Sequence, residues 1–146
     1  MTDSHEIDEI IQRMGGLFET LGKSPVTGKV MALLYFKGPV TQEELKNEIG
    51  CSLSAVSQSI AYLKNIGLIK IEKGDGRKKK YKTEFSKDKI KSAVEKFIFF
   101  GLNPMIDFLG EKEKIIRDND IRKKTKNLKD IYSGIKDKFL KSNIFE

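Results

Sequence analysis

The chain has 146 residues, of which 38% are apolar and 34% charged, and its formal net charge is +7. This length fits one domain, or a small domain with helical additions. The single cysteine, Cys51, excludes an internal disulfide framework and fits a reducing compartment. No apolar run approaches the roughly 18 residues of a membrane span, and the acidic N-terminus does not resemble a signal peptide. We therefore expect a cytoplasmic protein with no membrane partner.

The positive charge is unevenly distributed along the chain. The net charge is −1 for residues 1–40 and −1 for residues 41–66, but +6 for residues 67–91 and +3 for residues 92–146. A surplus gathered in one short stretch favours a localised surface that binds an anionic partner.

Residues 4–22 predict an amphipathic helix, with Ser4 as its N-cap and Gly22 as its stop. Gly15 and Gly16 lie mid-helix and cost about 1 kcal/mol each relative to alanine. Such a cost is tolerated where close packing, often against another chain, needs the space. The apolar residues recur at helical spacing and form one stripe: Ile7, Ile10, Ile11, Met14, Leu17, Phe18 and Leu21.

Two further helices follow, and each opens with a recognisable start signal. Residues 24–36 begin with Ser-Pro, an N-cap followed by proline at the first helical position. Residues 41–49 begin with the capping box Thr41-Gln42-Glu43-Glu44, in which the threonine oxygen caps free amides and Glu44 reaches back.

Residues 52–66 predict a second amphipathic helix after a tight turn, and residues 68–72 and 79–83 predict two short strands. The loop between the strands is dense in cationic side chains. This order of parts is a winged helix-turn-helix. The residues of the second helix that share its inward face are Val56, Ile60 and Leu63.

The C-terminal part predicts more helices. Ser86 caps a long helix that Gly101 and Pro104 interrupt, and residues 104–118 and 119–142 follow as helical stretches. A winged helix of about 65 residues cannot cover all these apolar stripes. The economical solution is a homodimer in which the first and last helices of two chains interleave. The alternative is that the terminal helices fold back on their own domain.

We thus expect a mostly α fold with a small β-hairpin wing, a winged helix-turn-helix flanked by N- and C-terminal dimerisation helices. The expected division is residues 1–22 as the N-terminal dimerisation helix, residues 23–85 as the DNA-binding domain and residues 86–146 as the C-terminal dimerisation region.

The second helix of a helix-turn-helix lies in the major groove of DNA. Placing its core residues inward leaves an outward face that is polar and uncharged near its start. Gln58 can pair bidentately with an adenine, serine hydroxyls can bind phosphates or base edges, and the amides around Ser52 and Ser54 suit a phosphate. The alternative is that this outward face is an ordinary solvent-exposed helix surface without a binding function. The residues of this predicted reading face are Ser52, Ser54, Ala55, Ser57, Gln58, Ala61, Tyr62 and Asn65, with Ala55 and Tyr62 at its margin.

The loop GDGRKKKYK supplies the basic part of the predicted interface. Arg77, at the tip, is the residue for insertion into a minor groove, because a planar guanidinium suits that narrow negative cleft. The lysines neutralise phosphates, each contributing about one unit to the salt slope of binding. A lysine run that serves only solubility is the alternative. The lysines concerned are Lys78, Lys79, Lys80 and Lys82.

Residues 22–83 resemble the MarR-type winged-helix regulators, in particular their GbsR-like branch. The resemblance rests on LGKSPVTGKVMALLYF, VTQEEL, SLSAVSQSIAYLKNIGLI and GDGRKKKY, in that order and spacing. It implies a homodimeric regulator of transcription that binds double-stranded DNA, with dimer contacts from the terminal helices. Some GbsR-like members respond to small ligands, but no residue here matches an effector pocket, so any effector stays unknown.

Three other features allow a functional and a structural interpretation. Cys51 could sense oxidants or be a small, half-buried apolar residue. His5 and Glu9 could share a metal or lie on the surface. A cluster of aromatic residues could line a ligand pocket or pack in the core or an interface: Phe97, Phe99 and Phe100.

No paired-carboxylate, nucleophile–base or phosphate-loop pattern supports catalysis. We therefore expect neither an enzyme nor a cofactor. Two functions remain as alternatives to a sequence-specific regulator: a winged-helix module that binds other proteins, and an architectural DNA binder without sequence preference.

Overall fold

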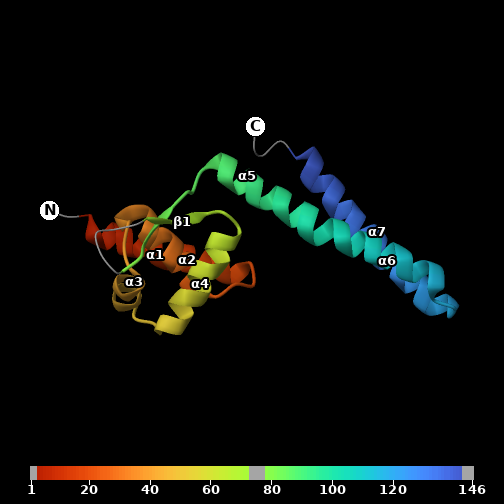
Figure 1. Cartoon of the computed structure of the whole chain (residues 1–146), viewed down its shortest axis with the longest axis horizontal. Helices are drawn as coiled ribbons and strands as arrows, with labels where there is room; N and C mark the ends of the chain where they lie inside the picture. The colour runs from red at the N-terminus through yellow and green to blue at the C-terminus, as the bar shows by residue number, and fades with distance from the viewer. Residues whose placement is uncertain (1–2, 73–77, 143–146) are drawn as a thin grey trace. The chain divides into compact units, whose positions relative to one another are not determined.

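The computed structural model describes residues 3–72 and 78–142. The chain divides into two compact units, residues 1–89 and 90–146. The mostly α fold with a small β-hairpin wing is confirmed. In chain order the elements are α1 (Ser4–Thr20), α2 (Pro25–Lys37), α3 (Gln42–Ile49), α4 (Leu53–Asn65), β1 (Ile69–Glu72), β2 (Lys80–Thr83), α5 (Lys87–Lys96), the π-helix η1 (Phe97–Leu102), α6 (Asn103–Ile115) and α7 (Asn119–Lys141) (Figure 1).

Side-chain caps start three of the helices of the first unit, as the sequence predicts. The Ser24 hydroxyl accepts from the amide of Val26 at 3.2 Å, and the Thr41 hydroxyl accepts from the amide of Glu44 at 3.2 Å. Ser52 caps α4 in the same way. The N-cap predicted at Ser4 is one residue off, because α1 already includes Ser4 and its N-cap is Asp3.

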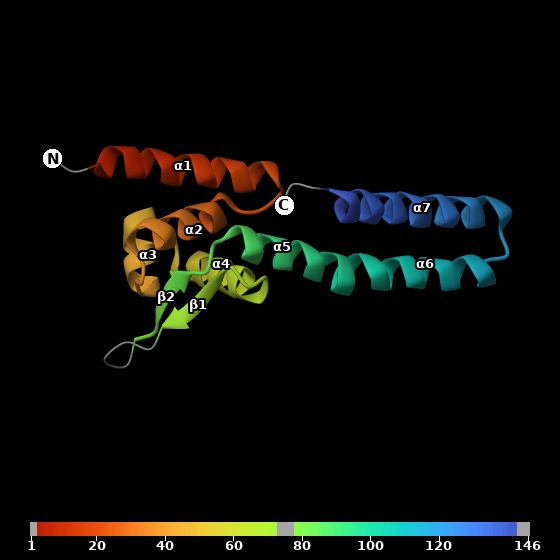
Figure 2. The same cartoon turned by 90° about the horizontal axis from the view of Figure 1, so that it is seen from above.

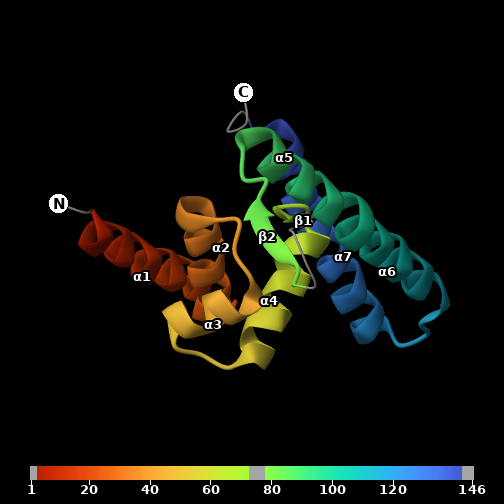
Figure 3. The ribbon, with the colours of Figure 1, turned by 60° about the vertical axis from the view of Figure 1, so that its left-hand side comes forward.

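The core of the first unit lies where α2 meets α4 and α3. Four consecutive apolar residues of α2, from Met31 to Leu34, are at most 2% exposed. Leu45 of α3 is fully buried. Gly50, with φ of 75°, ends α3, and the chain then turns into α4 (Figure 3). The inward face predicted for α4 is confirmed, since three of its apolar residues are at most 4% exposed: Val56, Ile60 and Leu63.

The crossing of α1 and α2 is built around two glycines. A Cβ on Gly28 would lie 2.2 Å from the carbonyl oxygen of Met14, and one on Gly15 would lie 3.1 Å from the carbonyl oxygen of Pro25. Gly15 therefore serves close packing, but within its own chain, whereas a Cβ on Gly16 would meet nothing within 4 Å. The backbones of the two helices can approach this closely only because both positions lack a side chain.

The wing is an antiparallel hairpin in which Ile69 pairs with Thr83 and Glu72 with Lys80. The predicted strands differ from the observed ones by one residue at the N-terminal end of each. Tyr81 is 6% exposed and anchors β2 in the core. Its backbone also exchanges two hydrogen bonds with Val40, so the segment before α3 forms an additional bridge to the hairpin.

A continuous helical stretch runs from α5 through η1 to α6, and all of it from residue 90 onward belongs to the second unit. Helix α7 follows and lies beside α6 (Figure 2). The predicted interruption at Gly101 and Pro104 is wrong. Proline cannot donate a backbone hydrogen bond, and the helix accommodates it by widening into π-helical turns, in which the amide of Asn103 donates to Ile98, five residues earlier. None of the helices in the described parts of the chain is long and apolar enough to span a membrane.

Replacing Gly28 by alanine should destabilise the protein by about 1–3 kcal/mol, because the new Cβ collides with backbone rather than with a flexible side chain. Gly16→Ala is the matched control: it also places alanine within a helix, but in open space, and should raise stability by up to about 1 kcal/mol. Urea denaturation of both variants measures the difference. Equal stabilisation by the two substitutions would contradict the observed crossing of α1 and α2.

Candidate nucleic-acid interface

One polar contact complements the apolar packing that orients α4. The hydroxyls of Ser59 on α4 and Thr27 on α2 lie 3.1 Å apart, and both residues are buried. A buried hydroxyl without a partner costs about 1–3 kcal/mol, so this hydrogen bond favours one rotation of α4 about its axis.

The predicted reading face of α4 points to solvent. Ser57 and Gln58 are exposed near its middle, and Ala55 and Tyr62 are half-buried at its margin, as predicted. This side of the helix is therefore available to a partner. The other exposed residues of the set are Ser52, Ser54, Ala61 and Asn65.

A side-chain amide connects this face to the wing. Ser57 Oγ donates to Gln42 Oε1 at 2.6 Å, and Gln42 Nε2 donates to the Tyr81 hydroxyl at 3.1 Å. Gln42 is the first residue of α3. One residue thus contacts the reading helix on one side and strand β2 on the other. Sequence reasoning missed this role of Gln42, because its partners lie 15 and 39 positions away and only the fold brings them together.

Other members of the reading face also have intramolecular partners. Gln58 Nε2 donates a long hydrogen bond of 3.4 Å to Ser54 Oγ, one helical turn earlier. The ammonium group of Lys23 lies 4.1 Å from the centroid of the Tyr62 ring. Lys23 places a positive charge at the margin of this face, and the sequence analysis did not include it.

The wing lysines fall into two groups. Lys78, Lys79 and Lys80 are exposed, and none of them forms an ion pair with any residue in the described ranges. Lys82 is half-buried, and its ammonium lies 3.7 Å from Glu72 Oε2 across the hairpin. Arg77, predicted as the minor-groove residue, lies outside the described residues.

Glu84 neutralises positive charge at the other end of the hairpin. Its carboxylate lies 3.0 Å from the Lys89 ammonium and 3.3 Å from the Lys70 ammonium. Hydrogen bonds from Lys89 and then Lys70 lower the pKa of the Glu84 carboxyl below its ordinary value. Together with Glu72 it pairs with three lysines of this region. Among the described residues of the hairpin, the lysines without an ion pair are therefore Lys78, Lys79 and Lys80.

A groove of about 310 Å³ brings the parts of the interface together. It lies where the start of α3, the first residue of α4 and the wing meet. Two lysines that form no ion pair within the described ranges therefore border the same groove as the N-terminal end of the reading helix. They give it a positive charge of two against one carboxylate, that of Glu43. The lining residues are Thr41, Gln42, Glu43, Leu53, Lys78, Lys79 and Tyr81.

The other features noted in the sequence form no comparable site. Cys51 is half-buried in the turn before α4. His5 and Glu9 are exposed on α1, and the described residues contain no group of three or more metal-binding side chains. The three phenylalanines of η1 are exposed by 53%, 66% and 73%, so they belong to a surface rather than a core: Phe97, Phe99 and Phe100.

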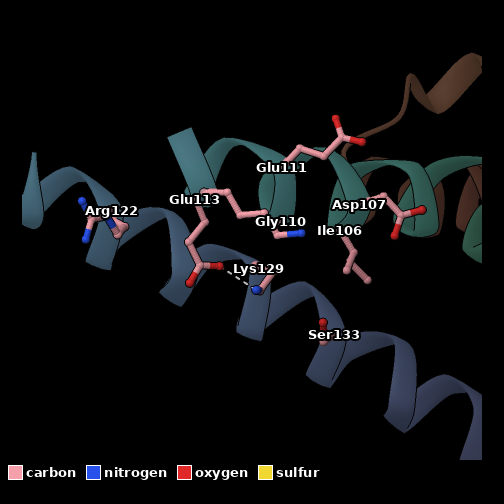
Figure 4. A pocket seen from close by; sticks show the side chains of 9 residues that line it. Ile106, Asp107, Gly110, Glu111, Glu113, Arg122, Lys129 and Ser133 are labelled. Carbon is pink, nitrogen blue, oxygen red and sulfur yellow. Dashed lines mark hydrogen bonds and ion pairs between the residues drawn. The ribbon is translucent and has the colours of Figure 1, made fainter. Parts of the chain in front are cut away.

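The second unit has a groove of its own between α6 and α7, with a volume of about 1070 Å³ (Figure 4). Lys129 donates to Glu113 across it at 2.6 Å. This contact lowers the pKa of the Glu113 carboxyl and raises the pKa of Lys129. Because Asp107, Glu111 and Arg122 also line the groove, its walls are largely polar.

The sequence pattern of one protein family, described as the TFIIE alpha subunit, matches residues 7–98. The chain belongs to the TFIIE alpha subunit family. The match runs from within α1 through α5, and thus includes the reading face and the wing. A comparison with curated proteins found no match to this chain.

A solved structure confirms the fold predicted from the sequence. A crystal structure described as a transcriptional regulator has a TM-score of 0.72 at 16% identity, covering 92% of each chain. MepR of Staphylococcus aureus, a regulator of the multidrug efflux pump MepA, gives a TM-score of 0.43 at 19% identity, covering 90% of this chain and 92% of that one. A MepR variant bound to an oligodeoxyribonucleotide gives 0.43 at 18% identity, with coverage of 90% and 91%. The fold assignment rests on the first of these.

The Glu84 carboxyl should titrate below the usual glutamate range, and its two ion pairs should stabilise the hairpin only while it is charged. This stabilisation is fully present above the ordinary glutamate pKa and is lost as the pH falls from there through the lowered pKa of the folded state. Carboxyl-detected NMR titration should show a larger rise of the pKa in Lys89→Met than in Lys70→Met. A pKa unaffected by both substitutions would contradict the pairing.

Proposed function

We propose that this protein is a regulator of transcription that binds specific sites in double-stranded DNA as a homodimer in the cytoplasm. The observation that carries the proposal is the groove at which the unpaired Lys78 and Lys79 adjoin the start of α4. A duplex that contacts these lysines through its phosphates would have the exposed polar face of α4 within reach of its bases. The match to the TFIIE alpha subunit family adds support for a role in transcription.

In this proposal the two surfaces have different roles. The reading face is nearly uncharged and offers hydroxyl and amide groups, which suit base edges in the major groove. The wing lysines contact phosphates, which supply affinity without sequence information. Arg77 completes the wing as a residue for the minor groove. Two copies would place their reading helices in successive major grooves, at half-sites about 10 bp apart.

Lys79→Gln should weaken binding to all sequences and reduce the salt slope by about one unit, because one phosphate contact is lost. Lys82→Gln is the matched control within the same hairpin, and its effect should be smaller because Lys82 is paired with Glu72. Titration of duplex binding against salt measures both slopes.

Selection from a random duplex library tests the function itself. Enrichment of a pseudo-palindromic site is the expected result. Binding without enrichment would favour an architectural role, and no binding even at low salt would contradict every nucleic-acid function.

One observation favours the protein-interaction function as a second candidate. The matched family is described as a subunit, and the second unit exposes large apolar side chains such as Phe100, at 73%, and Ile131, at 57%. A protein partner would cover such a surface. This alternative would be supported if the wild-type protein bound no duplex DNA but formed a stable complex with another transcription protein.

The homodimer is supported by apolar residues that the single chain leaves uncovered. Ile10 and Leu17 on α1 are 41% and 56% exposed, and both border a groove of about 560 Å³. Leu21, the residue that follows α1, is 69% exposed. Helix α1 carries four acidic residues against one arginine, whereas α7 carries eight basic residues against three aspartates. Opposite charges favour pairing of α1 with α7 of a second copy.

Leu17→Asp should dissociate the homodimer, raising its dissociation constant by at least about 100-fold, because an apolar interface would have to bury a carboxylate. Gln12→Asp adds the same charge to an exposed position on another side of α1 and should leave the association unchanged. Sedimentation equilibrium measures both, and circular dichroism checks that both variants are folded. A wild-type protein that stays monomeric at all concentrations would contradict the homodimer.

A further inference from the structure

The Gln42 side chain occupies a position from which it can control how α4 reads DNA. It lies between an exposed hydroxyl of the reading face, Ser57, and a buried anchor of the wing, Tyr81.

The distances determine which way round the amide of Gln42 lies. A separation of 2.6 Å from Ser57 Oγ suits an O–H···O hydrogen bond and is short for N–H···O. The separation of 3.1 Å from the Tyr81 hydroxyl suits N–H···O. Gln42 therefore presents Oε1 to Ser57 and Nε2 to Tyr81, and its Oε1 accepts the hydrogen bond that the Ser57 hydroxyl donates.

This arrangement fixes the hydrogen-bonding character of Ser57. A serine hydroxyl has one hydrogen to donate and two lone pairs. Because the hydrogen is directed to Gln42, only the lone pairs remain for DNA. In the major groove the donors that a lone pair can bind are the N6 amino group of adenine and the N4 amino group of cytosine.

We infer that Gln42 is a positioning residue for sequence recognition: by accepting the hydrogen bond of the Ser57 hydroxyl it makes Ser57 an obligate acceptor, which selects adenine or cytosine in the major groove. This inference rests on the proposed function, since it specifies the reading of DNA by α4. Gln42 acts through Ser57, and its second hydrogen bond, to Tyr81, holds the amide in the required orientation.

The test compares wild type, Gln42→Ala, Ser57→Ala and the double variant on the best site and on the same site with each base pair replaced in turn. Ser57→Ala should lower the preference for an adenine or cytosine at one base pair by about two- to tenfold, the equivalent of one neutral hydrogen bond. Gln42→Ala should also weaken the preference at that base pair, because the Ser57 hydroxyl, once free of Gln42, can donate a hydrogen bond as well as accept one. In the Ser57→Ala background the second substitution should add nothing to that preference.

Tyr81→Phe provides a second measurement. It removes the hydrogen bond that orients the amide but retains the ring, so the preference at that base pair should fall while thermal stability changes little. If Gln42 had only a structural role, Gln42→Ala would weaken binding to all sequences equally and leave the preference at that base pair intact, with or without the Ser57 hydroxyl. That result would overturn the inference. If the wild type binds DNA and Gln42→Ala does not change its base preference, only the inference is overturned. If the wild type does not bind duplex DNA at all, the proposed function is overturned as well.

Discussion

The packing of α4 on α2 determines what this protein can present to a partner. Val56, Ile60 and Leu63 are buried against the core, and Ser59 is bonded to Thr27 beside them. Successive residues of a helix are separated by about 100° around its axis, so a rotation by one position would expose these apolar groups and leave the Ser59 hydroxyl unpaired. The outward face is therefore fixed by the inward one. The exposed serines and Gln58 need no interaction of their own to point to solvent.

The charge of the wing is more localised than the net charge of the sequence suggests. Glu72 and Glu84 pair with Lys82, Lys70 and Lys89, and these pairs tie the hairpin together without adding to its positive potential. Among the described residues of the hairpin, the lysines without an ion pair are Lys78, Lys79 and Lys80, and the first two line the groove beside the start of α4. In the function that we propose, these lysines contact phosphates, and discrimination between sites comes from the reading face.

How far the sequence predicts the structure depends on the range of the interactions involved. The caps at Ser24, Thr41 and Ser52 are local, and each was predicted correctly from adjacent residues. The fold and the orientation of α4 followed from helical spacing. The Gln42 contacts could not be predicted, because they depend on how α3, α4 and β2 meet in space. The predicted interruption at Pro104 was wrong because the spacing of apolar residues does not distinguish a π-helical turn from the end of a helix.

The second unit places polar groups where a stable helical hairpin usually has apolar ones. Lys129 and Glu113 face each other between α7 and α6, while Ile131 and Leu128 of α7 are 57% and 41% exposed. Solvent screens such an ion pair, so it contributes little to stability, whereas burying one large apolar side chain contributes about 1.5–3 kcal/mol. Covering the exposed apolar side chains of α7 with a partner would therefore stabilise the α6–α7 pair more than its own ion pair does. In the homodimer that we propose, association would stabilise this unit directly, and the separation of the two reading faces would be a property of the pair rather than of either chain.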